Sequence, residues 1–483
     1  MTAFEQHLRE QSLDAKTQLL LTDPVALVGH SKRNWEHLPR AEVEAMQLRG
    51  LQQRFAQLRD QIPMLKKLAD GQGIEHIDCI DDVVPLLFEH TMYKSYPPSL
   101  LDNNKWAQIA KWMGKLVTPD IAASLAAADY SACEGLDDFF EVVGREVPQL
   151  RLGHSSGTSG TISFLPHSVS EAIKSTLARR LFIWDMDGPV AEPPELHVAY
   201  PYFRRGYATH LRGNDYTVKY VLKGEEYFHA AYPTLMSSDV LYLGAKIRAA
   251  QAKGTLDRLT ISPKLRAKKA EYDKLLADMP QHLENFFQTI AEELKGKRIF
   301  VWGTWNLLHG MATAGLKHGL EGVFAADSFI NTGGGAKGLE QPPGWREDIL
   351  RFTGARRLHE LYGMTEVLAS HFMCEHGNYH LAPTAVPYLL DPETSQPLPR
   401  EGRVTGRAAF FDLGADSRWG GFITGDEITI DWSTPCGCGR PSAYVLPLIQ
   451  RYSELQGGDD KITCAASANV HAEAMDFLNN FDI

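Results

Sequence analysis

The sequence lacks the features of several large protein classes. It has no apolar run of about 18 residues, the length expected of a membrane-crossing helix. Its N-terminus is charged from the first residues and has no apolar core of the kind found in signal peptides. It has only 6 cysteines among 483 residues, too few for a secreted disulfide scaffold. We therefore expect a cytoplasmic protein with reduced thiols and no membrane segment.

Positive charge is also scarce. The chain has 49 Lys and Arg against 60 Asp and Glu, which gives a formal net charge of −11. It has no basic tail and no surface motif of interleaved aromatic and basic residues. Binding to a nucleic-acid backbone needs clustered positive charge, so we exclude that class. The hydrophobic content of 44% suffices for one large domain or for two to three smaller ones.

The spacing of apolar residues changes along the chain. Amphipathic helices are predicted over Ala41–Ile62 and Asn104–Val117, within a mainly helical region that ends near residue 145. The middle of the chain alternates between strand and helix patterns, which predicts parallel strands joined by crossover helices. The predicted elements there are a strand at Arg298–Trp302, a helix at Trp305–His318, a strand at Gly322–Asn331, a helix at Trp345–Phe352 and a strand at Arg357–Leu361. Beyond about residue 380 the sequence becomes rich in β patterns.

A loop of small hydroxylated residues follows His154. It consists of Ser155, Ser156, Gly157, Thr158, Ser159 and Gly160. Glycine lets backbone N–H groups converge on a phosphate chain, and the hydroxyls add further donors. The loop is not a Walker A motif, because no Gly-Lys-Ser/Thr follows at the required spacing. The pattern therefore indicates either a phosphate-binding loop or a plain surface turn.

The same stretch also fits a different chemistry. Gly153–Gly157 satisfies the G-x-S-x-G pattern of serine hydrolases, with Ser155 as the nucleophile. That nucleophile must sit on a turn that runs directly into a helix. Thr161–Leu165 is instead β-branched and aromatic, which predicts a returning strand. A serine hydrolase stays as an alternative, and a strand after the loop would count against it.

Two further motifs belong to the predicted strand region. In Tyr362–Glu366 (Tyr-Gly-Met-Thr-Glu), the aromatic ring could stack on a base and the threonine could reach a phosphate. The carboxylate could hold Mg²⁺, which prefers oxygen ligands. In Thr424–Asp426 (Thr-Gly-Asp), an aspartate at a tight turn could accept hydrogen bonds from both ribose hydroxyls. Taken alone, the first of these motifs is equally typical of a strand-to-helix turn, and the second is more typical of an ordinary Gly-Asp hairpin turn.

Together and in this order, the three motifs resemble those of the adenylate-forming superfamily of acyl-CoA synthetases and adenylation domains. Cys436–Arg440 (Cys-Gly-Cys-Gly-Arg) is similar to a segment of phenylacetate–CoA ligases. Thr332–Lys337 (Thr-Gly-Gly-Gly-Ala-Lys) resembles a segment of the acyl-protein synthetases of bacterial bioluminescence. The resemblance covers about residues 150–455.

The resemblance implies an α/β fold with three parts. A helical N-terminal region (1–145) would pack on an adenylate-forming core (146–440), and a short remnant (441–483) would stand in place of a full C-terminal domain. A homodimer is a candidate assembly.

The resemblance also implies ATP and Mg²⁺ as cofactors and assigns roles to the motif residues. Thr365 would contact phosphates together with the Ser155–Gly160 loop, and Glu366 would ligate Mg²⁺. Asp426 and Arg451 would bind the ribose. Tyr362 and the turn of Gly333, Gly334 and Gly335 would hold the adenine, and Gly363 and Met364 are further candidates for binding the nucleotide.

The implied reaction joins two anions. A carboxylate, from an aryl or a fatty acid, attacks the α-phosphate of ATP and releases pyrophosphate, so Mg²⁺ and fixed donors must neutralise the developing charge. The acyl group would then pass to a thiol: CoA, a carrier-protein thiol or a protein cysteine such as Cys464.

The chain departs from the family pattern at two places. The family's phosphate loop continues with a lysine, whereas Gly160 is followed by Thr161; Lys337 is the candidate replacement as a catalytic cation. The family hinge reads Arg-x-Asp-Asp, whereas Arg451 is followed by Tyr-Ser-Glu. Lys461 is a candidate for the lysine that the family's C-terminal domain supplies. A non-catalytic nucleotide-binding scaffold is therefore a second alternative.

Four residues fit a zinc site. Thiolate and imidazole ligands in fours suit tetrahedral structural zinc, and such a site has no open position for catalysis. His376 is an alternative ligand, and buried reduced cysteines are the alternative explanation. The predicted ligands are Cys374, His380, Cys436 and Cys438.

Overall fold

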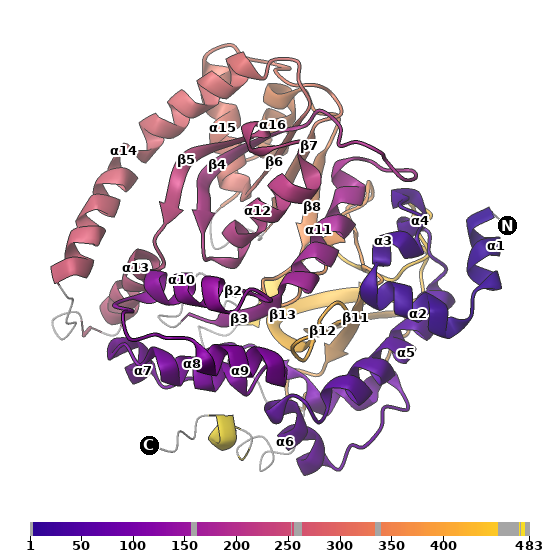
Figure 1. Ribbon diagram of the computed structural model, residues 1–483. Coiled ribbons are helices and arrows are strands. Elements are labelled where there is room, and N and C mark those ends of the chain that lie inside the picture. The colour runs from indigo at the N-terminus through magenta and orange to yellow at the C-terminus, as the bar shows by residue number, and fades with distance from the viewer. Residues whose placement is uncertain are drawn as a thin grey trace. The chain divides into compact units, whose positions relative to one another are not determined.

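Figure 1 shows the fold of the chain in a computed structural model. The structure describes residues 3–155, 162–252, 254–255, 263–333, 340–452, 473 and 475–478. By its contacts the chain divides into two compact units, each with its own sheet. Unit 1 comprises Met1–Gly153, Ser163–Pro189 and Met364–Ile483, and unit 2 comprises His154–Ile162 and Val190–Gly363. Among the described residues, no helix has both the length and the apolar character needed to cross a bilayer.

The N-terminal part of unit 1 is helical, as predicted. Helix α5 (Arg40–Leu58) buries Leu51 and Phe55 on one face. Proline at position 63 ends this stretch by starting the next helix, where a missing N–H costs nothing. The helices of this part are α1 (Ala3–Glu10), α2 (Leu13–Thr22), α3 (Pro24–Leu27), α4 (Lys32–Glu36), α5, α6 (Pro63–Gln72), α7 (Pro98–Asp102), α8 (Trp106–Gly114), α9 (Pro119–Ala127) and α10 (Leu136–Glu146).

The β-rich part of unit 1 confirms the prediction for the chain beyond residue 380. Its main sheet has the strand order β10-β14-β13-β12-β11, and the short strands β1 and β15 also pair with β13. Strand β13 therefore carries most of the pairing. The strands are β1 (Phe88–Glu89), β10 (Tyr379–His380), β11 (Ala385–Leu390), β12 (Arg403–Asp412), β13 (Gly421–Asp431), β14 (Tyr444–Val445) and β15 (Gln450–Arg451).

A strand pair and a helix complete the part of unit 1 that matters for function. Strands β2 (Leu150–His154) and β3 (Phe164–Ser168) form a two-stranded sheet. Helix α11 (Val169–Ile183) follows β3 without a connecting loop. Ser168 is its N-cap, since its Oγ accepts the N–H of Glu171 at 2.9 Å.

Unit 2 confirms the predicted parallel α/β pattern. Five of its strands lie in the order β5-β4-β6-β7-β8 and pair in parallel. Helices α15 and α16 pack on the same apolar cluster as β6 and β7. The strands are β4 (His197–Gly206), β5 (Phe228–Met236), β6 (Ile299–Gly303), β7 (Phe329–Gly333) and β8 (Leu358–Tyr362). The helices are α12 (Thr209–Val221), α13 (Ser238–Ala252), α14 (Pro263–Glu293), α15 (Trp305–Lys317) and α16 (Trp345–Thr353).

One predicted strand is shorter than expected. Only Phe329–Gly333 of the region predicted from Gly322 onward is a strand. Gly322 has φ of 58°, a left-handed conformation that an extended strand does not contain. Val323 and Phe324 are buried in the core of unit 2 without belonging to the sheet, so their apolar character mimics that of a strand.

Candidate functional site

The hydroxyl loop follows strand β2, and only its first residue is described. Ser155 follows the strand directly, whereas Ser156–Gly160 lies outside the described residues, so its phosphate role stays a prediction. The next element in the described part of the chain is strand β3, as the sequence predicts, and helix α11 comes only after it. A nucleophile elbow needs a helix directly after the serine, so this order counts against the serine hydrolase.

Two residues predicted to contact adenine end neighbouring strands of unit 2. Gly333 is the last residue of β7 and Tyr362 the last residue of β8, and Gly333 pairs with Leu361. Ligands of α/β folds bind outside such carboxyl ends. A Cβ at Gly333 would lie 3.1 Å from the Leu361 carbonyl oxygen, so the chain is tightly packed there. Three further predicted residues lie outside the described residues: Gly334, Gly335 and Lys337.

The chain passes into unit 1 after Gly363, and there it forms what we call the carboxylate centre: Glu366, Asp426 and Arg451. The Thr365 hydroxyl donates to Glu366 Oε2 at 3.0 Å. Burial and the nearby Asp426 carboxylate raise the pKa of Glu366, while the Thr365 hydroxyl and Arg451 oppose that shift. The second and third motifs therefore lie within electrostatic reach of each other in unit 1.

Asp426 is placed by a bulge in strand β13, which corrects the expectation of a tight turn between strands. On either side of it, β12 and β13 pair in register, but Ala408 alone faces Thr424, Gly425 and Asp426. The Thr424 hydroxyl donates to the Ala408 carbonyl at 2.8 Å and accepts the Asp426 N–H at 3.0 Å. A bulge re-aims a side chain without ending the strand.

Arg451 faces Asp426 from the neighbouring strand β15. The two residues are register partners, and Arg451 Nε lies 3.6 Å from Asp426 Oδ1. Arg451 is largely exposed, so this ion pair contributes little to stability. The pair is thus available to a ligand at little cost in folding energy.

A buried ionic network lies behind the second motif and escaped the sequence interpretation. His167 Nδ1 lies 2.9 Å from Glu171 Oε2, and Arg418 Nε donates to the same oxygen at 3.1 Å. Asp412 Oδ2 lies 3.8 Å from Arg418 Nη2. All four side chains are almost fully buried. The i,i+4 spacing of His167 and Glu171 at a helix start was the one local signal for this network.

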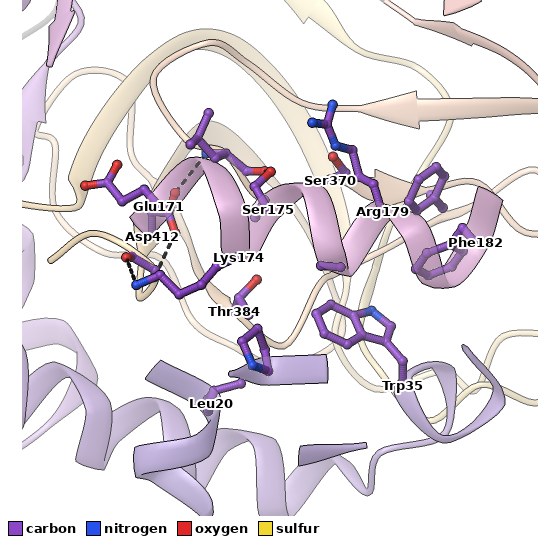
Figure 2. Close-up of a pocket in the computed structure, with 16 residues that line it drawn as sticks. Leu20, Trp35, Glu171, Lys174, Ser175, Arg179, Phe182, Ser370, Thr384 and Asp412 are labelled. Atoms are coloured by element: carbon purple, nitrogen blue, oxygen red, sulfur yellow. Dashed lines mark hydrogen bonds between the residues drawn. The ribbon is translucent and has the colours of Figure 1, made fainter. Parts of the chain in front are cut away.

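A cavity runs beside the same segment of unit 1. Figure 2 shows Lys174, Ser175, Arg179 and Phe182 projecting from α11 around it. The chain just after the second motif, at 368–370, forms another part of its lining. Polar and aromatic groups both line it, as suits a ligand with an apolar body and a polar end.

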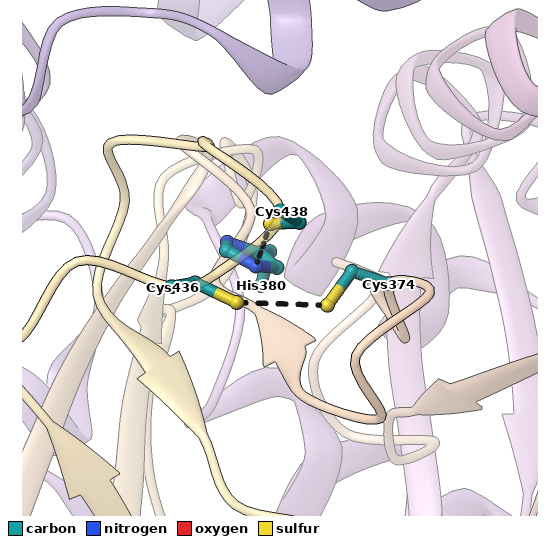
Figure 3. Close-up of side chains that lie close together, drawn as sticks. All are labelled: Cys374, His380, Cys436 and Cys438. Atoms are coloured by element: carbon teal, nitrogen blue, oxygen red, sulfur yellow. Dashed lines mark hydrogen bonds between the residues drawn. The ribbon is translucent and has the colours of Figure 1, made fainter.

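The four predicted zinc ligands come together at one point of unit 1, as Figure 3 shows. Their ligand atoms all lie within 4.8 Å of one another. Cys374 Sγ and Cys436 Sγ are 3.8 Å apart, and Cys438 Sγ lies 3.2 Å from His380 Nε2. His376, the alternative ligand, is not a member of this group.

The surroundings of this cysteine cluster suit a bound cation. The Ser442 hydroxyl hydrogen-bonds His380 Nδ1 at 2.8 Å, which leaves Nε2 turned toward the thiols. Burial lowers the pKa of His380 to about 4, so the imidazole is neutral at pH 7. Asn378 Nδ2 lies 3.4 Å from Cys436 Sγ, a donor of the kind that supports a thiolate. Three sulfurs and one imidazole match a closed structural zinc site.

The remaining predicted residues lie outside the described residues. Lys461 and Cys464 belong to this group, and so does most of the chain beyond Tyr452. Their roles, and the nature of the C-terminal remnant, stay predictions.

Neither a protein-family model nor a curated protein matches the sequence. Among solved structures, an open conformation of 2-hydroxyisobutyryl-CoA ligase in complex with 2-HIB-AMP and CoA has a TM-score of 0.51 and 14% identity, over 87% of this chain and 72% of that one. MatB from Rhodopseudomonas palustris has a TM-score of 0.35 and 15% identity, over 61% and 46% of the two chains. A long-chain-fatty-acid-CoA ligase from Archaeoglobus fulgidus has a TM-score of 0.37 and 11% identity, over 63% and 52%. The first likeness shows that this chain has the fold of adenylate-forming acyl-CoA ligases, which confirms the predicted α/β fold class.

Proposed function

We propose that the protein is an ATP-dependent ligase that converts a carboxylic acid to its acyl adenylate and releases pyrophosphate. The carboxylate centre is the observation that carries this proposal. Glu366 and Asp426 come from separate motifs, yet they are close enough for Asp426 to raise the pKa of Glu366. The fold likeness to a ligase whose structure holds 2-HIB-AMP and CoA supports the same reaction class.

The carboxylate centre fits Mg²⁺. Burial and a second carboxylate both disfavour ionised Glu366. A divalent cation would relieve both effects, and carboxylate oxygens are ligands that Mg²⁺ prefers. Glu366 would hold the ion, with Asp426 contributing negative charge nearby. When bound, Mg²⁺ would supply neutralisation of the phosphate charge.

The other residues would bind and orient the nucleotide. Asp426 would accept hydrogen bonds from the ribose hydroxyls, beside the exposed guanidinium of Arg451. In unit 2, Tyr362 and Gly333 would hold the adenine at the carboxyl ends of β7 and β8. The loop Ser156–Gly160 would donate backbone and hydroxyl hydrogen bonds to the phosphates.

The proposed acyl acceptor is a thiol, either of CoA or of a carrier protein. The CoA named with the similar ligase supports CoA as the first acceptor to test. An aryl or a fatty acid is the proposed substrate class.

The test is ATP–pyrophosphate exchange by the purified full chain with Mg²⁺ and a panel of aryl and fatty acids. We expect exchange that depends on one class of acid, that Glu366→Gln lowers by about 1,000-fold and that Glu401→Gln leaves unchanged. Glu401 is an exposed residue and serves as the matched control. ATP binding without exchange for any acid would instead favour the non-catalytic scaffold. Ester hydrolysis that is lost in Ser155→Ala would favour the hydrolase.

We also propose that the cysteine cluster holds a structural Zn²⁺. Cys374, Cys436 and Cys438 would bind as thiolates, and His380 would bind through Nε2. The ion would tie the chain after strand β9 (His371–Phe372) to the segment between β13 and β14, which no disulfide among the described cysteines joins. No open ligand position would remain for catalysis.

A further inference from the structure

The second motif is held in place by side chains. Thr365–Leu368 belongs to neither a helix nor a strand. The Thr365 carbonyl accepts a hydrogen bond from His167 Nε2 at 2.8 Å. Beyond Glu366, the Leu368 N–H donates to Asp412 Oδ2 at 2.8 Å. Glu366 is therefore fixed from both sides by groups that belong to other parts of unit 1.

A third contact completes this arrangement. The Ser175 hydroxyl donates to the Leu368 carbonyl at 2.8 Å. Ser175 and Glu171 lie one turn apart on α11, so one helix carries both a direct anchor and the partner of His167. Anchoring the main chain through side chains requires the burial of polar groups, which is unfavourable. Such an arrangement is usual where a residue must be held for function.

His167 is itself fixed by the buried ionic network. Its side chain is 1% exposed, and Glu171 lies against Nδ1 at 2.9 Å. Arg418 holds the same Glu171 oxygen at 3.1 Å, and its guanidinium also contacts the Tyr93 hydroxyl at 3.4 Å. Arg418 and the hydrogen-bonded His167 keep the pKa of Glu171 below its ordinary value despite its burial. The Glu171 carboxylate is thus held in place, and it orients the His167 imidazole.

The hydrogen bond to Thr365 fixes where one proton of His167 lies. Nε2 faces a carbonyl oxygen, which can only accept, so Nε2 carries a proton. Nδ1 lies 2.9 Å from a carboxylate oxygen of Glu171. Both ring nitrogens are therefore engaged, and the ring cannot turn without losing two hydrogen bonds.

We propose that His167 is a positioning residue for Glu366, holding the Thr365 carbonyl through Nε2–H so that the Glu366 carboxylate is placed for Mg²⁺ and phosphate. The inference rests on the proposed function, because it assigns a purpose to the placement of Glu366. A purely structural role would instead depend on the contact of Nδ1 with Glu171.

Two substitutions separate these roles. His167→Gln places an amide N–H near the position of Nε2 and keeps a donor for the Thr365 carbonyl. His167→Asn places its amide near the position of Nδ1, keeps a partner for Glu171 and cannot reach Thr365. If His167 has a positioning role, the activity should tolerate His167→Gln but not His167→Asn. If its role is purely structural, the activity should tolerate His167→Asn but not His167→Gln.

The first measurement is hydrogen exchange of the peptide that contains residues 365–368 in the full chain. We expect faster exchange in His167→Asn than in His167→Gln. His197→Asn is the control, because this buried histidine belongs to unit 2 and contacts His229 at 3.2 Å. Equal exchange in the Asn and Gln variants would overturn the proposal.

The second measurement is ATP–pyrophosphate exchange over a Mg²⁺ titration. We expect His167→Asn to lower kcat by about 100-fold and to raise the Mg²⁺ requirement, with the KM for the acid unchanged. His167→Gln should stay within about threefold of the wild type. A higher activity for Asn than for Gln would overturn the proposal.

A third variant covers the case in which His167→Asn does not fold. Ser175→Ala removes one anchor and leaves the ionic network intact, and it should change hydrogen exchange and kcat in the same direction. An effect on neither quantity would overturn the anchoring. If the wild type shows no acid-dependent exchange while His167→Asn still loosens residues 365–368, the proposed function fails and the anchoring stands. If the wild type is active while both histidine variants match it, the inference fails alone.

Discussion

Unit 1 contains two polar centres that are built in opposite ways. The cysteine cluster gathers four ligand atoms within 4.8 Å and is closed by its own side chains. In the carboxylate centre, burial and a neighbouring negative charge both disfavour ionised Glu366, and its cation Arg451 is largely exposed. The cluster is complete once it holds one ion, whereas the carboxylate centre gains most from a charged ligand that enters from solvent.

The difference extends to the groups behind each centre. Next to the cluster, Ser442 and Asn378 contact the ligands directly. Behind the carboxylate centre, the buried ionic network acts on the main chain around Glu366. A permanently bound ion orients its own ligands. A side chain that binds its ligand only transiently must instead be held in place by the rest of the protein. We therefore expect loss of function from changes at the carboxylate centre and loss of stability from changes at the cluster.

The largest effect is expected for Glu366→Gln. Because Glu366 is the proposed Mg²⁺ ligand, its loss should lower ATP–pyrophosphate exchange by about 1,000-fold. Stability should move the other way. A carboxyl whose folded pKa is raised costs free energy of folding at pH values above that pKa, and glutamine removes this cost. The free energy of unfolding at pH 7 without Mg²⁺ should therefore rise, as measured by urea denaturation.

The exposed Glu401→Gln is the control for both measurements. Retained exchange in Glu366→Gln would remove this residue from the site. A large loss of stability without loss of exchange would reverse the comparison between the two centres.

The second effect is expected at the cysteine cluster. Cys436→Ser, or removal of metal by a chelator, should lower the free energy of unfolding by about 3 kcal/mol, because a structural ion contributes its binding energy to folding. Metal analysis should find about one zinc per wild-type chain and less in the variant. Cys133→Ser is the matched control, a buried cysteine outside the cluster. A wild-type protein that is free of metal and unaffected by chelators would contradict the zinc proposal.

A smaller effect is expected for Asp426→Asn. This variant loses the carboxylate that would accept hydrogen bonds from the ribose hydroxyls. The Kd for ATP should therefore rise about tenfold, which corresponds to about 1.4 kcal/mol. The free energy of unfolding should change little, because Arg451, the ion-pair partner of Asp426, is largely exposed. Glu427→Gln, on the next residue of β13, is the control. Isothermal titration with ATP measures the Kd for ATP in the wild type and in both variants. Equal ATP affinities of Asp426→Asn and the wild type would count against the ribose role.

Strong periodicity made much of the fold predictable from the sequence. Helix α5 and strand β6 have apolar patterns that few other structures produce, and both were predicted within a few residues. The strand at Gly322–Asn331 was predicted to start too early, because Val323 and Phe324 are buried outside the sheet. The bulge at Asp426 was missed because a Gly-Asp pair is more typical of a turn.

The candidate site was predictable only where its chemistry is local in sequence. The cysteine cluster could be proposed because thiols and an imidazole have few other common purposes in fours. The buried ionic network could not, since charged residues normally predict surface. Arg418 and Glu171 compensate each other only through a contact across 247 positions of the chain. Such a pair becomes visible only once the fold brings it together.

The smallest effect concerns His371, which lies on the chain between the two centres, after Leu368 and before Cys374. Its side chain is 1% exposed, and Nδ1 accepts the Ala382 N–H at 3.0 Å. Burial lowers the pKa of His371 to about 4. Below its ordinary pKa of about 6.5, the unfolded chain takes up a proton that the folded chain refuses. Stability is therefore full above pH 6.5 and falls as the pH drops toward 4.

We expect His371 to account for about 1 kcal/mol of the stability lost between pH 7 and pH 5.5. His371→Asn should flatten the pH dependence by that amount, because an amide oxygen can accept the Ala382 N–H without titrating. His76→Asn, at a highly exposed histidine, should leave the slope unchanged. Urea denaturation at pH 5.5, 6 and 7 compares the three proteins. Parallel slopes for wild type and His371→Asn would mean that the connection between the two centres opens readily to water, so that the centres are less firmly joined than their hydrogen bonds imply.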